Sequence, residues 1–216
     1  DFDNDGWKDL FVTNGIRRDV NNKDFYNKHR DFFNKMENDS SYKNKEEEVK
    51  LLDYLKKMPS EKIANYMYKN NQDLSFQDVG DDWGFGEKTF SNGVAYSDLD
   101  NDGDLDLILN NLENKATIYR NNSKDANFLI IRLEDEKNKP LIGSKVTIQT
   151  SDITQMQELN VARGYMSSVS PRLHFGLGKQ KNVKKITVEW PNGKVSLLDS
   201  IKGNQEIVIT SKSAQI

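Results

Sequence analysis

The 216-residue sequence contains no cysteine and no long apolar run. Without cysteine the chain cannot form disulfides, thiolate zinc sites or iron–sulfur clusters, and it has no cysteine nucleophile. No stretch approaches the roughly 20 consecutive apolar residues that a membrane-spanning helix needs. The first residues are acidic, unlike the basic start and apolar run of a targeting segment. We therefore expect no membrane-spanning segment in this chain.

A concentrated positive charge is also missing. The net charge is -3, and it divides into about -8 over residues 1–127 and +5 over residues 128–216. The basic residues of the second part are scattered along expected strands instead of forming a patch, and the first part is acidic. Nucleic-acid binding is therefore disfavoured.

Two acidic stretches repeat one another. DFDNDGWKDL begins at Asp1 and DLDNDGDLDL begins at Asp98, 97 residues later, and the two align without a gap over ten positions. A second repeated element, Tyr-basic-Asn-Asn, begins at Tyr68 and at Tyr119, which are 51 residues apart. A repeat of about 51 residues suits one blade of a β-propeller, so some 46 extra residues lie between the first acidic stretch and Tyr68.

The spacing of the carboxylates within each acidic stretch predicts a calcium loop. Calcium takes six to eight oxygen ligands, which a tight loop supplies from alternate residues. Glycine at position six permits the sharp turn, and four carboxylates in one short loop repel each other without a cation. The candidate ligands in the first loop are Asp1, Asp3, Asp5, the carbonyl of Trp7 and Asp9; those in the second are Asp98, Asp100, Asp102, Asp104 and Asp106.

These loops differ from EF-hands. Position twelve holds Val12 or Leu109 where an EF-hand needs a bidentate glutamate, and the following residues have the pattern of a strand. Solvated acidic turns are the simpler alternative, and magnesium is less favoured than calcium because it keeps several waters. The α-ammonium group of Asp1 beside the first loop predicts weaker calcium binding there than at the second loop.

The segment between the first acidic loop and Tyr68 has helical spacing. Apolar residues from Asp24 to about Met58 recur every three to four positions, which predicts two amphipathic helices joined by a polar run from Asn38 to Lys45. We expect a helical insertion at about 17–62. Its aromatic stripe either packs on the host domain or offers a surface to a partner.

The rest of the chain alternates short apolar runs with turn signals, which is typical of β structure. KITVEWPNGKV, from Lys185, predicts a strand that enters a tight turn, with Trp190 in the core. We expect a mainly β protein with two domains. Residues 1–126 form partial β-propeller blades with the α-helical insertion, and residues 127–216 form a small β-sandwich or barrel-like domain, with the boundary near 124–127.

Two family resemblances follow from these motifs. The loop DxDxDGxxDL, Tyr-x-Asn-Asn and Trp83-Gly84-Phe85-Gly86 resemble the FG-GAP or VCBS repeats of integrin-like β-propellers. GSKVTIQT, the run Arg163 to Ser168, HFGLG at His174 to Gly178, and VEWPNG resemble the ASPIC/UnbV domain. The resemblance implies calcium in the loops and the C-terminal fragment of a larger protein whose remaining blades are partners. It implies an extracellular or cell-surface location, either secreted or associated with a bacterial outer membrane, and supplies no catalytic residue.

The expected function is that of a non-enzymatic calcium-binding module for adhesion, recognition or scaffolding, with an unknown protein or glycan ligand. The alternative is a carbohydrate-binding or hydrolase-associated module of a polysaccharide-handling surface protein, in which exposed aromatic residues contact the sugar. An enzyme would use His174 as a base beside Ser167, Ser168 and Ser170, but no nucleophile elbow surrounds these serines. A packed histidine at the end of a strand is the simpler interpretation of His174.

Overall fold

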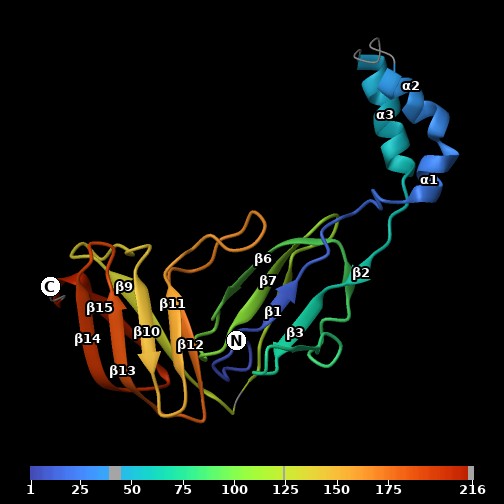
Figure 1. Cartoon of the computed structure of the whole chain (residues 1–216). Coiled ribbons are helices and arrows are strands. Elements are labelled where there is room, and N and C mark those ends of the chain that lie inside the picture. Colours follow the sequence, from blue (N-terminus) through green and yellow to red (C-terminus); the bar gives the residue numbers. More distant parts are fainter. Residues whose placement is uncertain (39–44, 124, 214–216) are drawn as a thin grey trace.

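The computed structural model describes residues 1–38, 45–123 and 125–213, and the fold is mainly β, as the sequence predicts. Two three-stranded sheets carry the acidic loops, a pair of sheets forms the C-terminal part, and helices stand at the opposite end (Figure 1). Whether the first two sheets are propeller blades stays a prediction.

Each acidic loop leads into an antiparallel sheet of short strands. The first sheet has the order β1-β3-β4 and the second has the order β6-β7-β8. A small two-stranded sheet pairs β2 with β5 beside them. The strands are β1 (Leu10–Val12), β2 (Ile63–Ala64), β3 (Tyr66–Asn70), β4 (Phe76–Asp78), β5 (Lys88–Thr89), β6 (Ser91–Ser97), β7 (Asp106–Asn111) and β8 (Thr117–Tyr119).

The two sheets repeat in register as well as in sequence. Leu10 pairs with Tyr68 across β1 and β3, and Leu107, at the equivalent loop position, pairs with Tyr119 across β7 and β8. The sheets pack on each other: Met67 of β3 is fully buried in one cluster with Leu107 and Leu109 of β7. The repeat is therefore structural.

The other face of the first sheet is apolar and exposed. Alternation along the strands and direct pairing place seven side chains on this face, of which five are apolar or aromatic and two, Asn70 and Asp78, are polar. In the second sheet, the positions equivalent to Leu10 and Val12 are Leu107 and Leu109, which are buried against the first sheet. The apolar and aromatic residues of this face, here called the outer face, are Leu10, Val12, Tyr66, Tyr68 and Phe76.

The predicted insertion forms three helices, where the spacing had predicted two. They are α1 (Lys23–Lys28), α2 (Arg30–Asn38) and α3 (Lys45–Lys57), and the polar run expected between the helices falls mostly on residues 39–44, outside the described residues. The Asn22 side chain caps α1 by accepting a hydrogen bond from the Phe25 N–H at 2.8 Å. The chain breaks at His29, whose φ of -112° interrupts the helical path.

The aromatic stripe of the insertion packs between its own helices. The rings of Phe32 in α2 and Tyr54 in α3 stack with centroids 3.7 Å apart, and His29 meets Tyr54 at 5.0 Å. The helices stand away from the sheets (Figure 1), so this stripe is occupied by internal contacts instead of the host domain.

The C-terminal part is a sandwich of two sheets, with the orders β12-β9-β15 and β11-β10-β13-β14. No closed barrel forms among the described residues, so of the two predicted architectures the sandwich is the one observed. β15 runs parallel to β9, whereas the other strand pairs of the sandwich are antiparallel. The strands are β9 (Asn127–Glu134), β10 (Lys145–Gln149), β11 (Thr154–Glu158), β12 (Leu173–Gly178), β13 (Asn182–Glu189), β14 (Val195–Lys202) and β15 (Gln205–Thr210), and a short 3-10 helix covers Ser211–Ser213.

The sandwich core confirms the expected hairpin. Trp190 is 3% exposed, and its indole N–H donates to the Ser196 hydroxyl at 2.8 Å. Gly193 has a φ of 81°, the left-handed conformation that the turn after Trp190 requires. Isoleucine, leucine and valine side chains from both sheets fill the remaining space between them.

Candidate metal centre at the domain junction

The two acidic loops adopt the same backbone. Asn4 and Asn101 have φ values of 57° and 60°, and Gly6 and Gly103 have φ values of 95° and 93°. The Gly6 N–H donates to Asp1 Oδ1 at 3.1 Å, and the Gly103 N–H donates to Asp98 Oδ2 at 3.1 Å. Each loop is therefore folded around the carboxylate at its first position.

Three carboxylates converge in each loop. Oxygens of Asp1, Asp3 and Asp5 lie within 4.8 Å of one another, as do oxygens of Asp98, Asp100 and Asp102. Burial raises the pKa of Asp98. A cation between the three oxygens would offset both this burial and the mutual repulsion.

The aspartates at position nine of the loops, Asp9 and Asp106, accept hydrogen bonds from the backbone. Asp9 accepts the Phe2 N–H at 2.8 Å and the Asn70 N–H at 3.0 Å. Asp106 accepts the equivalent Leu99 and Asn121 N–H groups at 2.9 and 2.8 Å. These carboxylates tie the start of each loop to the Tyr-basic-Asn-Asn element, and the structure does not bring them into the clusters of three.

The basic residue of that element also contacts its loop. Lys69 pairs with Asp3, and Arg120 pairs with the equivalent Asp100 at 2.6 Å and with Asp102 at 3.6 Å. The hydrogen bond to Asp3 raises the pKa of Lys69. The sequence repeat showed Lys69 and Arg120 at matching positions, but their role as counter-ions of the loops was not foreseen.

Position seven distinguishes the loops. Trp7 is 37% exposed, whereas Asp104 is 2% exposed, and neither carboxylate oxygen of Asp104 has a hydrogen-bond partner within the described residues. Burial, followed by the nearby carboxylates of Asp102 and Asp106, raises the pKa of Asp104 to about 7. A buried carboxylate without a partner is costly unless a cation or proton neutralises it. The donors at the second loop therefore fit a hard cation such as calcium, and the first loop shares its geometry.

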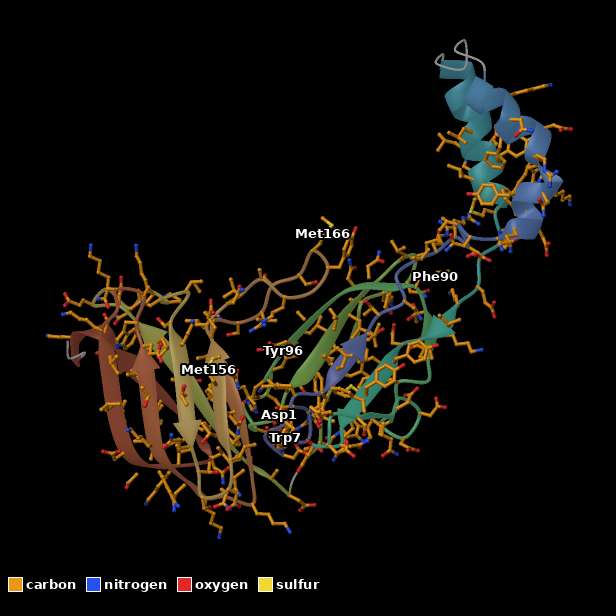
Figure 2. All side chains as sticks on the ribbon, in the orientation of Figure 1. Asp1, Trp7, Phe90, Tyr96, Met156 and Met166 are labelled. Atoms are coloured by element: carbon orange, nitrogen blue, oxygen red, sulfur yellow. The ribbon has the colours of Figure 1, made fainter. Side chains whose placement is uncertain are left out.

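Both loops lie at the junction with the C-terminal sandwich, where Figure 2 places Asp1 and Trp7. The buried side chain of Asn4 reaches His174 of β12, with Asn4 Oδ1 and His174 Nε2 2.6 Å apart. The Gly176 N–H donates to Asp1 Oδ2 at 3.1 Å. Sequence reasoning did not anticipate these contacts, although the asparagine repeated at position four of both loops was a visible signal.

His174 is packed in this junction and is not paired with a serine. Burial lowers its pKa to about 3, so the imidazole is neutral at ordinary pH. Its Nε2 meets Asn4, its Nδ1 has no hydrogen-bond partner within the described residues, and the Ser167 hydroxyl donates to the Tyr165 carbonyl instead. In the part of the chain that the structure describes, no hydrogen bond joins His174 to Ser167, Ser168 or Ser170.

A family profile matches most of the C-terminal part. Residues 134–216 match the family profile described as ASPIC and UnbV, which confirms the resemblance for that segment. The FG-GAP or VCBS assignment of the first part stays a prediction. Among the described residues, no helix has the length and apolar character to cross a membrane.

Curated relatives point to one kind of protein. The chain is 30% identical to human Cartilage acidic protein 1 over 122 residues, which are 54% of this chain and 18% of that protein. It is 31% identical over 108 residues to the proteins of the same name from Mus musculus and Xenopus tropicalis, covering 48% of this chain and 17% and 16% of theirs. The chain thus spans less than a fifth of the length of these relatives.

Proposed function

From this similarity we propose that the chain is a non-enzymatic, calcium-stabilised β module of a larger secreted or cell-surface protein that works in adhesion, recognition or scaffolding. The observation that carries the calcium assignment is the convergence of three carboxylates in each loop, with the buried carboxylate of Asp104 next to Asp102 in the second loop but outside its group of three. The similarity to Cartilage acidic protein 1 supports the extracellular location.

In this mechanism, carboxylates at positions one, three and five of each loop hold the ion, and Asp104 adds a further oxygen in the second loop. The carbonyl of Trp7 would serve in the first loop, while Asp9 and Asp106 orient the loops through their backbone hydrogen bonds. The calcium ion, when bound, neutralises the clustered negative charge. The ordered loops then stabilise the pairing of β1 with β3 and of β7 with β8.

A melting curve in calcium and in chelator tests this proposal. At a free calcium concentration of about 100 times Kd, each site stabilises the fold by about 2.7 kcal/mol, which corresponds to a rise of roughly 5–11 °C for a chain of this size. The double variant Asp98→Asn with Asp102→Asn should lose at least half of the rise, because the second loop is expected to bind calcium more tightly. Asp73→Asn, an exposed control outside the loops, should keep all of it. An identical midpoint in calcium and chelator would refute calcium stabilisation.

The outer face supports an assignment of the first two sheets as partial propeller blades. Its equivalent in the second sheet is covered by Phe11 and Met67 of the first sheet. We therefore propose that another sheet of the same repeat covers the outer face, as the remaining blades of a longer chain would. A photo-cross-linker placed at Tyr66 in the natural protein should attach to a strand of another repeat. Attachment only to an unrelated protein would argue against this arrangement.

A pocket supports carbohydrate recognition as the second candidate function. It has a volume of about 290 Å³ and lies between the two repeat sheets, with aromatic rings on its wall and polar groups beside them. Aromatic faces next to amide and hydroxyl groups suit a sugar ring. Trp83→Ala should abolish binding on a glycan array if this function holds, while Trp7→Ala, in the first loop, should leave it intact. The relevant lining residues are Trp83, Phe85, Tyr119, Asn122 and Ser123.

A further inference from the structure

The first acidic loop covers the free edge of a strand in the sandwich. β12 pairs with β9 on one side only, and its other edge faces the loop. On that edge the Gly176 N–H donates to Asp1 Oδ2 at 3.1 Å and the Gly178 N–H donates to the Asn4 carbonyl at 2.8 Å. The loop thus satisfies backbone groups that an open edge would leave exposed.

Asn4 connects three parts of the junction. Its Nδ2 donates to the Gly103 carbonyl of the second loop at 2.9 Å, so its Oδ1 is the acceptor that faces His174 Nε2 at 2.6 Å. His174 must then carry its proton on Nε2. Because Asn4 is only 3% exposed, water cannot readily replace these partners.

The sandwich also closes over the second loop. A β-carbon at Gly103 would lie 1.8 Å from the ring of Phe128, at the start of β9. The Phe128 ring lies nearly parallel to the His174 ring, with an angle of 11° and centroids 6.1 Å apart. The glycine turns of both loops are therefore seated against β9 and β12.

We infer that the sandwich completes the acidic loops, with His174 as the positioning residue of the first loop, and that its docking on the repeats and calcium binding stabilise each other. This inference rests on the proposed calcium function. The loop that carries Asp1, Asp3 and Asp5 is held by β12 at three points. Gly178 bonds the Asn4 carbonyl, Gly176 bonds the Asp1 carboxylate, and His174 contacts the Asn4 side chain. Linkage requires that if docking raises calcium affinity, calcium strengthens docking by the same factor.

The first experiment measures calcium affinity loop by loop. Isothermal titration of a chain with Asp98→Asn and Asp102→Asn reports the first loop, and a chain with Asp3→Asn and Asp5→Asn reports the second. His174→Ala, which removes the donor to Asn4, should weaken binding at the first loop about tenfold. His174→Gln can donate to Asn4 through its amide and should restore most of the affinity. His29→Ala, the same change in the helical insertion, should alter neither loop.

Two results would overturn the inference: unchanged affinity at the first loop in His174→Ala, or a glutamine variant as weak as the alanine variant while both remain folded. Circular dichroism checks the fold. An equal loss at both loops would also overturn it, because the role of His174 would then be general stability instead of positioning.

Amide exchange on the unmodified chain decides the question even if the alanine variant does not fold. Calcium should slow exchange at Gly176 and Gly178 at least tenfold relative to chelator. The Trp190 amide, bonded to Lys194 within the sandwich, serves as a reference that calcium leaves unchanged. If the protein bound calcium but amide exchange at β12 did not change, this inference would be wrong and the proposed function would stand. If neither loop bound calcium, both the inference and the proposed function would be wrong.

Discussion

Gly176 offers the most direct stability test of the junction, because no side chain fits there. A β-carbon at this position would lie 2.5 Å from the carbonyl carbon of Asn4 and 2.5 Å from Asp1 Oδ2. Real β-carbons essentially never approach backbone atoms this closely, so Gly176→Ala must push the first acidic loop away from β12.

The expected magnitude follows from two opposing effects. Overpacking of a well-packed site costs about 1–3 kcal/mol, and replacing glycine by alanine returns about 0.4–1 kcal/mol through the unfolded chain. The net loss of about 1–2 kcal/mol lowers the melting temperature by roughly 2–8 °C in a chain of this size. The hydrogen bond from Gly176 to Asp1 would be lost in the same step.

Gly86→Ala is the matched control. A β-carbon at Gly86 would meet only the carboxylate end of the Asp81 side chain, at 3.0 Å, and that side chain can move. The control should melt at or slightly above the temperature of the unmodified protein. Thermal melts followed by circular dichroism compare the two variants. If Gly176→Ala melted within about 1 °C of Gly86→Ala, the junction described above would be wrong.

Three further outcomes are expected. Asp104→Asn removes a buried charge without a partner, so chelator-treated protein should gain about 1–3 kcal/mol of unfolding free energy in denaturant melts, while calcium should stabilise it less than it stabilises the parent. Arg120→Gln removes a cation that competes for Asp100, so calorimetry should find tighter calcium binding at the second loop, by a few-fold; weaker binding would refute competition. The pKa of His174 is about 3 in the folded state and near 6.5 in the unfolded state. The contribution of this buried, neutral imidazole to the free energy of unfolding is therefore fully present above pH 6.5. It declines as the pH falls toward 3, and about 2 kcal/mol is lost at pH 5. In His174→Gln, melts between pH 3 and pH 6.5 should show a smaller loss of stability. A loss equal to that of the unmodified protein would contradict the low pKa of His174.

The acidic loops and the β13–β14 hairpin could be predicted because their signals are local. Asp98, Asp100 and Asp102 converge through a turn within one loop, and the turn after Trp190 depends on adjacent residues. For β12, only the end of a strand near His174 was predicted and not the strand through Gly178, since HFGLG lacks alternation and contains two glycines.

The junction could not be predicted from the sequence. Asn4 and His174 are 170 positions apart, and nothing near either residue in the sequence specifies its partner. Gly176 is a further case, since its need for glycine comes from the loop that packs on it. Such contacts depend on how two domains pack, which no periodicity or motif encodes.

The helical insertion also has a consequence for how the chain folds. Residues 13–65 separate the paired Val12 and Tyr66, whereas residues 110–116 separate the equivalent pair Leu109 and Thr117. Closing the longer connection as a flexible loop would cost about 2 kcal/mol more, by loop-closure entropy. The ends of the insertion meet, however, since the Asp19 N–H donates to the Pro59 carbonyl at 2.9 Å. A helical hairpin that forms early would shorten the effective connection, and the first repeat would then pair its strands almost as rapidly as the second.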